Sequence, residues 1–299
     1  MIIARLKGGL GNQMFIYAVS KALAVKNNTE LALDTITGFK YDHLYKRKIE
    51  ITFFNINYKQ AGRLKSFNYP LGRYIRKASE VIERNVLYPA QKILIEKNSN
   101  SFDGDMIKLK CKEIYMEGYW QSEKYFSNIE QQLRNEFVFN TELFSQETLE
   151  EAERIKNTFG NSVSVGIRRY QEVPTFGRNE SGGVLSKNYY LNLIEKIASE
   201  NENARFFIFC EDAEWIKSEF KELSYKNYII SPKNGPYSSL EDMYLFSLCQ
   251  THIISNSSFY WWGAWLSNPQ KKIVYAPDNF VNKDTIPSGW IKVNTKDKL

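Results

Sequence analysis

The sequence contains little cysteine and little histidine. Its three cysteines, Cys111, Cys210 and Cys249, are far apart, and its two histidines, His43 and His252, belong to no metal-binding or catalytic motif. This spacing excludes a disulfide framework and a cysteine zinc site, and it favours a reducing compartment. We expect no metal site, and we expect His252, which precedes an apolar run, to be structural.

Long apolar runs are also missing. The longest ones, near Ile253 and Trp261, are interrupted by Ser, Asn and Gly, so none is long enough to span a bilayer. The N-terminus shows no basic segment followed by an apolar one, which predicts a cytoplasmic protein without a signal peptide. The 299 residues are 43% hydrophobic and 15% aromatic, enough for two globular domains or one large one.

The positive charge is unevenly distributed. The net charge is +6, and the segment Lys59–Lys97 holds nine basic residues against three acidic ones, which equals the whole excess. Apolar residues alternate with these charges at roughly helical spacing. The pattern favours a solvated helix packed on its own domain, and peripheral contact with an anionic membrane is the alternative. No nucleic-acid-binding motif accompanies the charge, so we expect no nucleic-acid partner.

The chain opens with a short apolar strand, Ile2–Leu6, that runs through a glycine loop into a helix expected at Asn12–Lys26. Gly9 and Gly11 would let the backbone approach a ligand, and Asn12 is a favourable helix cap beside an anion-binding N-terminus. The loop begins like a dinucleotide fingerprint, with Asp34 as the ribose acid, but Met14 replaces the third glycine. An NAD site, an ordinary turn and a site for another ligand all remain open at this point.

Strand and helix signals alternate along the chain. The first part predicts strands at Glu30–Asp34 and Glu113–Glu117 and helices at Ser122–Phe137 and Glu147–Phe159. The second part predicts parallel βαβ units, because short apolar strands alternate with helices. Its strands are expected at 163–167, 205–210, 228–230, 252–255 and 272–275, and its helices at 187–200, 213–222, 240–249 and 259–266. Gly160-Asn161 predicts a domain boundary that separates residues 1–159 from 160–299.

Polar residues follow several strands of the second part. Arg168 and Arg169 come directly after one strand, and guanidinium groups bind phosphate oxygens through paired N–H bonds. A surface ion pair with Glu172 or another acid is the alternative. Glu211-Asp212 ends the next strand; these acids suit a purine or a ribose hydroxyl, or they begin a helix.

Asn256, Ser257 and Ser258 lead into an aromatic helix that starts at Phe259, which predicts a second anion site, simple helix capping, or both. The tryptophans of that helix are expected in the core rather than stacked on a sugar. Asp103-Gly104-Asp105 is similar to a metal-binding acidic pair, but a turn is the favoured interpretation.

These segments together resemble the bacterial α-1,2-fucosyltransferases of glycosyltransferase family 11. The match lies in residues 8–15 (Gly-Gly-Leu-Gly-Asn-Gln-Met-Phe), 118–122 (Gly-Tyr-Trp-Gln-Ser), the strand with Arg168-Arg169, 209–215 and 254–265. The resemblance implies an α/β fold of the GT-B type, with two Rossmann-like domains that face each other across a cleft. The N-terminal domain, 1–159, would hold the acceptor, and the C-terminal domain, 160–299, would hold the nucleotide sugar.

The resemblance also implies a reaction. Fucose would move from GDP-fucose to a galactose-ended oligosaccharide, which a lipid could carry, with inversion and without a metal or other cofactor. The product would belong to a bacterial surface polysaccharide such as the O-antigen.

The same resemblance assigns the site residues. Arg168 and Arg169 would bind the donor pyrophosphate; Asn256, Ser257, Ser258 and Phe259 would bind phosphate; Glu211 and Asp212 would face guanine or ribose. Gly9, Gly11 and Asn12 would approach the donor from the acceptor domain.

One motif departs from the family pattern. The family reads His-x-Arg-Arg-Gly-Asp-Tyr, whereas this sequence reads Gly-Ile-Arg-Arg-Tyr-Gln-Glu from Gly166 to Glu172. Glu172 lies one residue beyond the missing acid and is the candidate catalytic base. The departure leaves three other possibilities: another nucleotide sugar or acceptor, a non-catalytic carbohydrate-binding relative, or an NAD-linked oxidoreductase.

Overall fold

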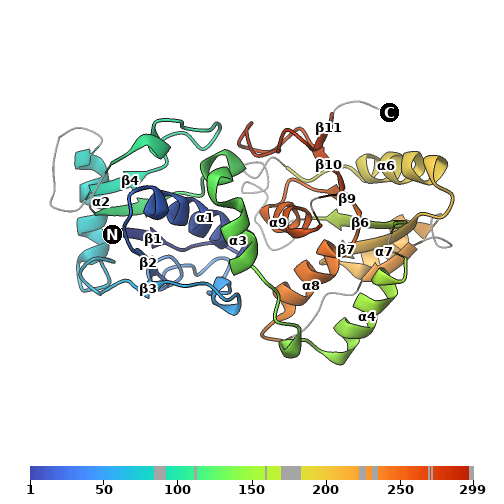
Figure 1. Ribbon diagram of the computed structural model, residues 1–299, viewed down its shortest axis with the longest axis horizontal. Coiled ribbons are helices and arrows are strands. Elements are labelled where there is room, and N and C mark those ends of the chain that lie inside the picture. Colours follow the sequence, from blue (N-terminus) through green and yellow to red (C-terminus); the bar gives the residue numbers. More distant parts are fainter. Residues whose placement is uncertain are drawn as a thin grey trace. The chain divides into compact units, whose positions relative to one another are not determined.

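Two parallel sheets, each the centre of its own unit, organise the chain in the computed structural model (Figure 1). The units comprise Met1–Val138 and Phe139–Leu299. The structure describes residues 1–83, 92–110, 113–158, 160–169, 183–221, 227–230, 235–268, 270 and 272–295.

The first unit contains a sheet of five described strands in the order β3-β2-β1-β5-β4. Every pairing is parallel. The strands are β1 (Ile2–Arg5), β2 (Leu31–Asp34), β3 (Lys59–Gln60), β4 (Lys92–Ile95) and β5 (Ile114–Glu117), and the helices are α1 (Leu10–Lys26), α2 (Gly72–Glu83) and α3 (Glu130–Glu136).

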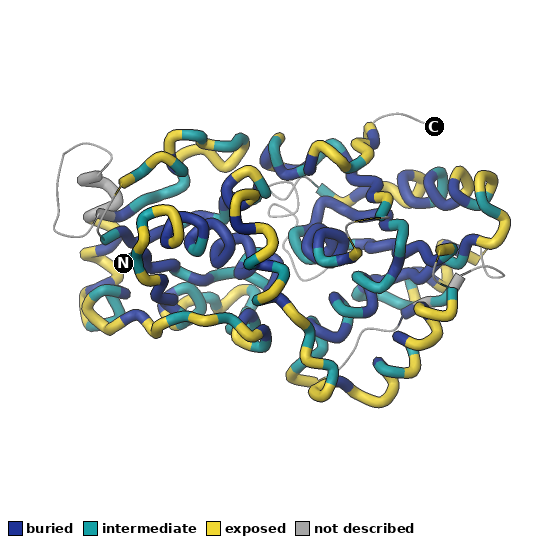
Figure 2. The backbone as a smooth tube through the Cα atoms, viewed as in Figure 1, coloured by how far each residue is buried: buried dark blue, intermediate teal, exposed yellow. Residues whose placement is uncertain are grey.

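Helix α1 is buried along most of its length, as the dark tube in Figure 2 shows. It packs against β1 and β2, and α2 packs against β4. Ile3, Ala32, Ile93 and Tyr115 form one apolar cluster on this sheet, with Phe67 packed against it. Burial of a sheet by helices explains why β1, β2 and β5 are largely continuous apolar runs rather than alternating ones.

The second unit contains a sheet of six described strands in the order β11-β10-β9-β6-β7-β8, again parallel throughout. The strands are β6 (Ser162–Ile167), β7 (Arg205–Cys210), β8 (Asn227–Ile230), β9 (Thr251–Ile254), β10 (Ile273–Pro277) and β11 (Ile291–Val293). The helices are α4 (Gln146–Lys156), α6 (Lys187–Glu200), α7 (Ala213–Glu219), α8 (Ser238–Ser247) and α9 (Ser258–Leu266).

Strand β6 shows how this core is built. Val163, Val165 and Ile167 join a buried cluster with residues of α6 and α7. The intervening positions face the other side, where Ser164 contacts His252 and Gly166 lies against the ring of Tyr260 in α9. The period of two along the strand therefore distributes its side chains between two helical layers.

Three sequence predictions about local structure are wrong. Helix α1 begins at Leu10 with Gly9 as its cap, so Asn12 lies inside the helix and does not cap it. The basic segment is not one amphipathic helix, because residues 92–95 form the strand β4 beside β5. The predicted helix 122–137 is two short 3₁₀ turns followed by α3.

The boundary between the units falls between Val138 and Phe139, before the break expected at residues 159–162. Residues just before α4 pack on α8: the rings of Phe139 and Phe144 lie 5.4 and 5.2 Å from that of Tyr244, and the Ser145 N–H donates to Glu241 at 2.6 Å. These contacts place α4 in the second unit. The assignment of acceptor and donor domains stays a prediction, and Phe159 lies outside the described residues.

Candidate active site

The point where the strand order of the second unit reverses lies between β6 and β9. From β6 the chain moves outward through β7 to β8, and then returns to β9 and moves outward again through β10 to β11. This is the order of the nucleotide-binding Rossmann fold, whose ligands bind beyond the carboxyl ends of the strands at such a point. The residues that follow β6, β7 and β9 therefore define the candidate site.

Both arginines after β6 contact the acids after β7. The Arg168 Nη1 atom lies 3.2 Å from Glu211 Oε1, and Arg169 Nη1 lies 3.1 Å from Asp212 Oδ2. Glu211 Oε1 also accepts the Arg169 backbone N–H at 2.8 Å. The four side chains are 20–27% exposed, so they are partly desolvated and still reachable by a ligand.

Arg169 is further fixed by an aromatic ring and by a helix. Its guanidinium carbon lies 4.2 Å from the centre of the Trp215 ring, in cation–π geometry. Asp212 caps α7, since its Oδ1 accepts the Trp215 N–H at 2.9 Å. One carboxylate thus holds the helix start and the arginine together. The sequence predicted that an acid at this position could begin a helix, but it did not predict the pairing of Asp212 with Arg169.

The residues after β9 form the start of α9. The Ser257 hydroxyl accepts the Phe259 N–H at 3.3 Å as the helix cap, and the Asn256 side chain donates to the Gly183 carbonyl at 2.9 Å. Ser258 is the first residue of the helix. Capping by serine is therefore confirmed, and the helix N-terminus lies at the carboxyl edge of the sheet, where a positive dipole end suits an anion.

Gly166 fits closely beneath the ring of Tyr260. A Cβ atom at Gly166 would lie 2.5 Å from Tyr260 Cγ. The Tyr260 hydroxyl donates to the backbone carbonyls of Ile167 and Phe209 at 3.4 and 3.2 Å, which fastens α9 to β6 and β7. The glycine in place of the family's histidine therefore has a structural reason here, because the tyrosine ring occupies the space of a side chain.

In the first unit the strand order reverses between β1 and β5, and the motifs at residues 8–15 and 118–122 follow these strands. They are joined by the Gln121 side chain, which donates to Asn12 Oδ1 at 2.8 Å. Gly9 faces a cation, since a Cβ atom there would lie 3.9 Å from the guanidinium carbon of Arg47. Gly11 is buried. The structure thus brings Gly9, Asn12 and Gln121 to one place, whereas their role toward a donor stays a prediction.

Gln13, in the same motif, has a structural role. Its buried amide donates to the carbonyls of Gly8 and Lys48 at 2.9 and 2.8 Å and accepts the N–H groups of Glu50 and Ile51 at 2.9 and 3.1 Å. A single side chain therefore ties the glycine loop to the segment 48–51.

The Gly118–Ser122 motif is held by Glu96, whose carboxylate accepts the N–H groups of Tyr119 and Trp120 at 2.7 and 2.9 Å. Burial raises the pKa of Glu96, and these bonds partly offset the effect. Trp120 has a positive φ of 46°, a conformation that this clasp stabilises.

Several other sequence predictions can be placed. Trp261, Trp262 and Trp265 are core residues as expected. Asp103 Oδ1 accepts the Asp105 N–H at 2.9 Å, which confirms the turn. His252 is fully buried, with Nδ1 2.7 Å from Ser164 Oγ, and burial lowers its pKa to about 3.

Asp34, the candidate ribose acid, is also fully buried, and it accepts hydrogen bonds from Thr37 and Tyr115. Its carboxylate therefore serves the interior of the first unit, which counts against the dinucleotide interpretation. Glu172 lies outside the described residues, and so does Cys111. Among the described residues no group of His, Cys, Asp or Glu could hold a metal ion, and no helix there is long and apolar enough to cross a membrane.

Comparison with solved structures identifies the class. The fucosyltransferase NodZ from Bradyrhizobium has a similar fold, with a TM-score of 0.55 at 14% identity over 89% of this chain and 93% of its own. Together with two parallel Rossmann-like sheets and a cationic site at the switch point, this similarity defines an α/β glycosyltransferase fold of the GT-B type.

The family follows from the sequence. The model of Glycosyl transferase family 11 matches residues 1–293, and the chain belongs to this family. An alpha-1,2-colitosyltransferase of Escherichia coli is 32% identical over 312 residues, which cover 98% of this chain and 99% of the relative. The O-antigen biosynthesis glycosyltransferase WbnK of Escherichia coli is 27% identical over 310 residues, with 98% and 96% covered. Family membership excludes the NAD-linked oxidoreductase.

Proposed function

We propose that this glycosyltransferase moves fucose from GDP-fucose to a galactose-ended oligosaccharide in an α-1,2 linkage, with inversion and without a metal, during bacterial O-antigen synthesis. The observation that carries the proposal is the pair Arg168 and Arg169 at the Rossmann switch point, opposite the start of α9. Family membership supports a glycosyl transfer reaction, and the relative that acts in O-antigen biosynthesis supports a role in that pathway.

The chemistry needs positive charge at the leaving group. As the bond from fucose to phosphate breaks, negative charge grows on the GDP diphosphate. Two guanidinium groups and the N–H groups at the start of α9, with Ser257, Ser258 and Phe259, would stabilise this charge because they are already oriented before the reaction. Arg168 and Arg169 would thereby do what a divalent cation does in other enzymes. Glu172 stays the proposed catalytic base.

Glu211 and Asp212 would act on the donor through the arginines. Each carboxylate lies within 3.2 Å of a guanidinium nitrogen, so each orients one phosphate-binding group. Contact of these acids with guanine or ribose, which the resemblance implies, is compatible with this arrangement and remains part of the proposal.

Colitose is the second candidate for the transferred sugar. The relative that is 32% identical over almost the whole chain is an alpha-1,2-colitosyltransferase. Colitose is fucose without one ring hydroxyl, so both donors present the same diphosphate to Arg168 and Arg169. The choice between them depends on groups around the sugar rather than on the arginines.

The decisive experiment offers a panel of nucleotide sugars, including GDP-fucose and GDP-colitose, with galactose-ended acceptors, and identifies products by mass spectrometry. Transfer of fucose in α-1,2 linkage supports the proposal, and transfer of colitose alone selects the second candidate. Turnover should persist in EDTA, since the arginines supply the charge. Binding of acceptor without transfer or donor hydrolysis would instead identify a non-catalytic carbohydrate-binding relative.

Arg168→Ala should abolish transfer and weaken GDP binding in calorimetry. Arg154→Ala is the matched control, because Arg154 is a half-exposed arginine of the same unit that pairs with Glu151 on the surface of α4. Full activity of Arg168→Ala would remove that residue from the reaction.

We also propose peripheral contact with an anionic membrane on its cytoplasmic face. Leu71, Tyr74 and Ile75, at the start of α2, are 70%, 69% and 46% exposed, and Arg73 and Lys77 are exposed beside them. Exposed apolar side chains among basic ones suit an interface rich in acidic lipids. We call these five residues the α2 patch. The protein should float with anionic liposomes at low salt and stay behind with zwitterionic ones.

A further inference from the structure

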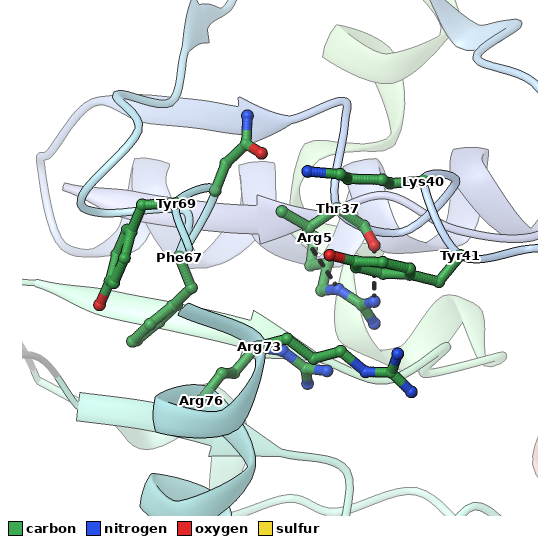
Figure 3. Close-up of a pocket in the computed structure, with 9 residues that line it drawn as sticks. Arg5, Thr37, Lys40, Tyr41, Phe67, Tyr69, Arg73 and Arg76 are labelled. Carbon is green, nitrogen blue, oxygen red and sulfur yellow. Dashed lines mark hydrogen bonds between the residues drawn. The ribbon is translucent and has the colours of Figure 1, made fainter. Parts of the chain in front are cut away.

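A pocket in the first unit lies where β1 and β2 end and α2 begins (Figure 3). About 320 Å³ of empty space lies within its lining, a volume that includes open solvent. Among the residues that the structure describes, its lining contains four cations, Arg5, Lys40, Arg73 and Arg76, and no acid. The other lining residues are Thr37, Tyr41, Phe67, Asn68 and Tyr69.

Two of the cations form the floor of the pocket. Arg5 donates to Thr37 Oγ1 at 3.1 Å and to the Thr37 carbonyl at 2.9 Å, as the dashed lines in Figure 3 show. Its Nη1 lies 2.6 Å from Glu117, and Arg76 pairs with the same carboxylate. The carboxylate of Glu117 thus pairs with both of these nearly buried guanidinium groups, and the Lys7 ammonium also lies 3.9 Å from it.

The other two cations flank a tyrosine at the mouth. The Lys40 ammonium and the Arg73 guanidinium carbon lie 5.7 and 4.7 Å from the centre of the Tyr41 ring. Within the described part of the chain, neither cation has a carboxylate within salt-bridge distance. Figure 3 shows the Tyr41 ring between them. Both side chains are exposed, so their charge is available to a ligand.

The backbone at the wall of the pocket adopts strained conformations. Phe67 and Leu71 have positive φ angles of 55° and 67°, which non-glycine residues rarely adopt. The backbone of Gly72 packs directly against that of Phe67, since a Cβ atom at Gly72 would lie 2.1 Å from the Phe67 carbonyl oxygen. Strain of this kind, about 1–3 kcal/mol per residue, is concentrated at ligand sites, and here it occurs at Phe67, which lines the pocket, and at Leu71, just before α2.

We propose that this pocket binds a sugar phosphate or diphosphate group of the acceptor, an inference that rests on the proposed transferase function. A lining with four cations suits a ligand with more than one negative charge, and Arg binds phosphate through paired N–H groups. Tyr41, Phe67 and Tyr69 offer rings to the sugar attached to the phosphate. Arg73 also belongs to the α2 patch, so an acceptor whose diphosphate joins it to a lipid would have its lipid part beside Leu71, Tyr74 and Ile75.

The first test measures binding of inorganic pyrophosphate to the full chain by calorimetry, with the donor site saturated by GDP. The wild type should bind pyrophosphate, and Arg73→Gln should weaken binding by about tenfold or more, as expected for a lost charged hydrogen bond. Lys77→Gln is the matched control, because Lys77 is exposed on the same helix but does not line the pocket. Absence of binding, equal loss in Lys77→Gln, or displacement of pyrophosphate by GDP would overturn the proposal.

The second test compares two acceptors, one galactose-ended oligosaccharide with a diphosphate at its reducing end and the same oligosaccharide without it. Arg73→Gln should raise KM for the diphosphate acceptor only and leave kcat unchanged. An equal effect on both acceptors would overturn the assignment to an acceptor phosphate. The assignment would also be overturned if anionic lipid vesicles that carry no acceptor competed for the pocket as well as the diphosphate acceptor does. The calorimetric test needs no transfer, so failure of fucose transfer and failure of the pocket give different results.

Discussion

Replacement of Gly166 by alanine should strain the join between β6 and α9. The added Cβ atom would lie 2.5, 2.6 and 2.8 Å from three carbons of the Tyr260 ring, where unstrained carbon atoms stay about 3.5 Å apart or more. The ring cannot move aside easily, because it is 7% exposed and its hydroxyl bonds two backbone carbonyls. Overpacking costs about 1–3 kcal/mol, and three close contacts indicate the upper end, about 3 kcal/mol.

Thermal unfolding followed by circular dichroism would measure this cost. A loss of about 3 kcal/mol corresponds to a fall in Tm of about 6–12 °C for a domain of this size. Gly289→Ala is the matched control, since a Cβ atom at Gly289 meets nothing within 4 Å. Gly289→Ala should leave the Tm within about 1 °C of the wild-type value, as expected for a surface substitution.

A double-mutant cycle identifies the cause. In a Tyr260→Ala background, Gly166→Ala should cost close to nothing, because the ring it collides with is gone. Transfer activity should fall in the single Gly166→Ala variant, because Gly166 lies in β6 only two residues before Arg168, which directly follows that strand. A melting temperature equal to that of the wild type, or an undiminished cost in the Tyr260→Ala background, would refute the reasoning.

Three further predictions concern Glu211, His252 and Gln13. Glu211→Gln should lower kcat/KM by about 10- to 100-fold, because a charge-assisted bond worth about 1.5–3 kcal/mol no longer orients Arg168, whereas Glu214→Gln on the surface should have no effect. Burial lowers the pKa of His252 to about 3 in the folded protein, whereas the pKa in the unfolded chain is about 6.5. Between these two pH values protons bind preferentially to the unfolded state, so the free energy of unfolding should fall as the pH drops from about 6.5 toward 3. Denaturant titrations at pH 7 and pH 5 should differ by about 2 kcal/mol more in the wild type than in His252→Gln, with His43→Gln behaving like the wild type. Gln13→Leu should cost about 2–4 kcal/mol in urea unfolding, because it removes the four hydrogen bonds that the buried Gln13 side chain makes with the backbone of Gly8, Lys48, Glu50 and Ile51; a loss below 1 kcal/mol would contradict this.

The parallel strands of the second unit could be predicted because their apolar composition reflects their burial between helices. Strands such as Arg205–Cys210 are covered by helices, so they are apolar throughout and stand out from the polar turns around them. The same rule placed Arg168, Glu211 and Asn256 at the ends of strands, where the structure has them. The basic segment was interpreted wrongly in part, because Lys92–Ile95 is too short for its period to distinguish a strand from a helix.

Partners far apart in the chain could not be predicted in the same way. Nothing in the sequence near Arg169 indicates that Asp212 pairs with it or that Trp215 lies under it. The cationic pocket could not be predicted from the sequence for the same reason, since Arg5 and Arg76 meet at Glu117 only after β1, β5 and α2 have packed together. The boundary at Val138 likewise depends on the packing of the residues before α4 against α8.

The sequence by itself determined the family, the parallel α/β architecture and the strand-end positions of the candidate site residues, because motif order and hydrophobic period are local properties of the chain. Only the tertiary structure decided which charges face each other, why Gly166 has no side chain, and where four cations surround a pocket. The physical reason is that ion pairing, steric exclusion and electrostatic potential depend on distances in space, and the strand order of the sheets sets these distances.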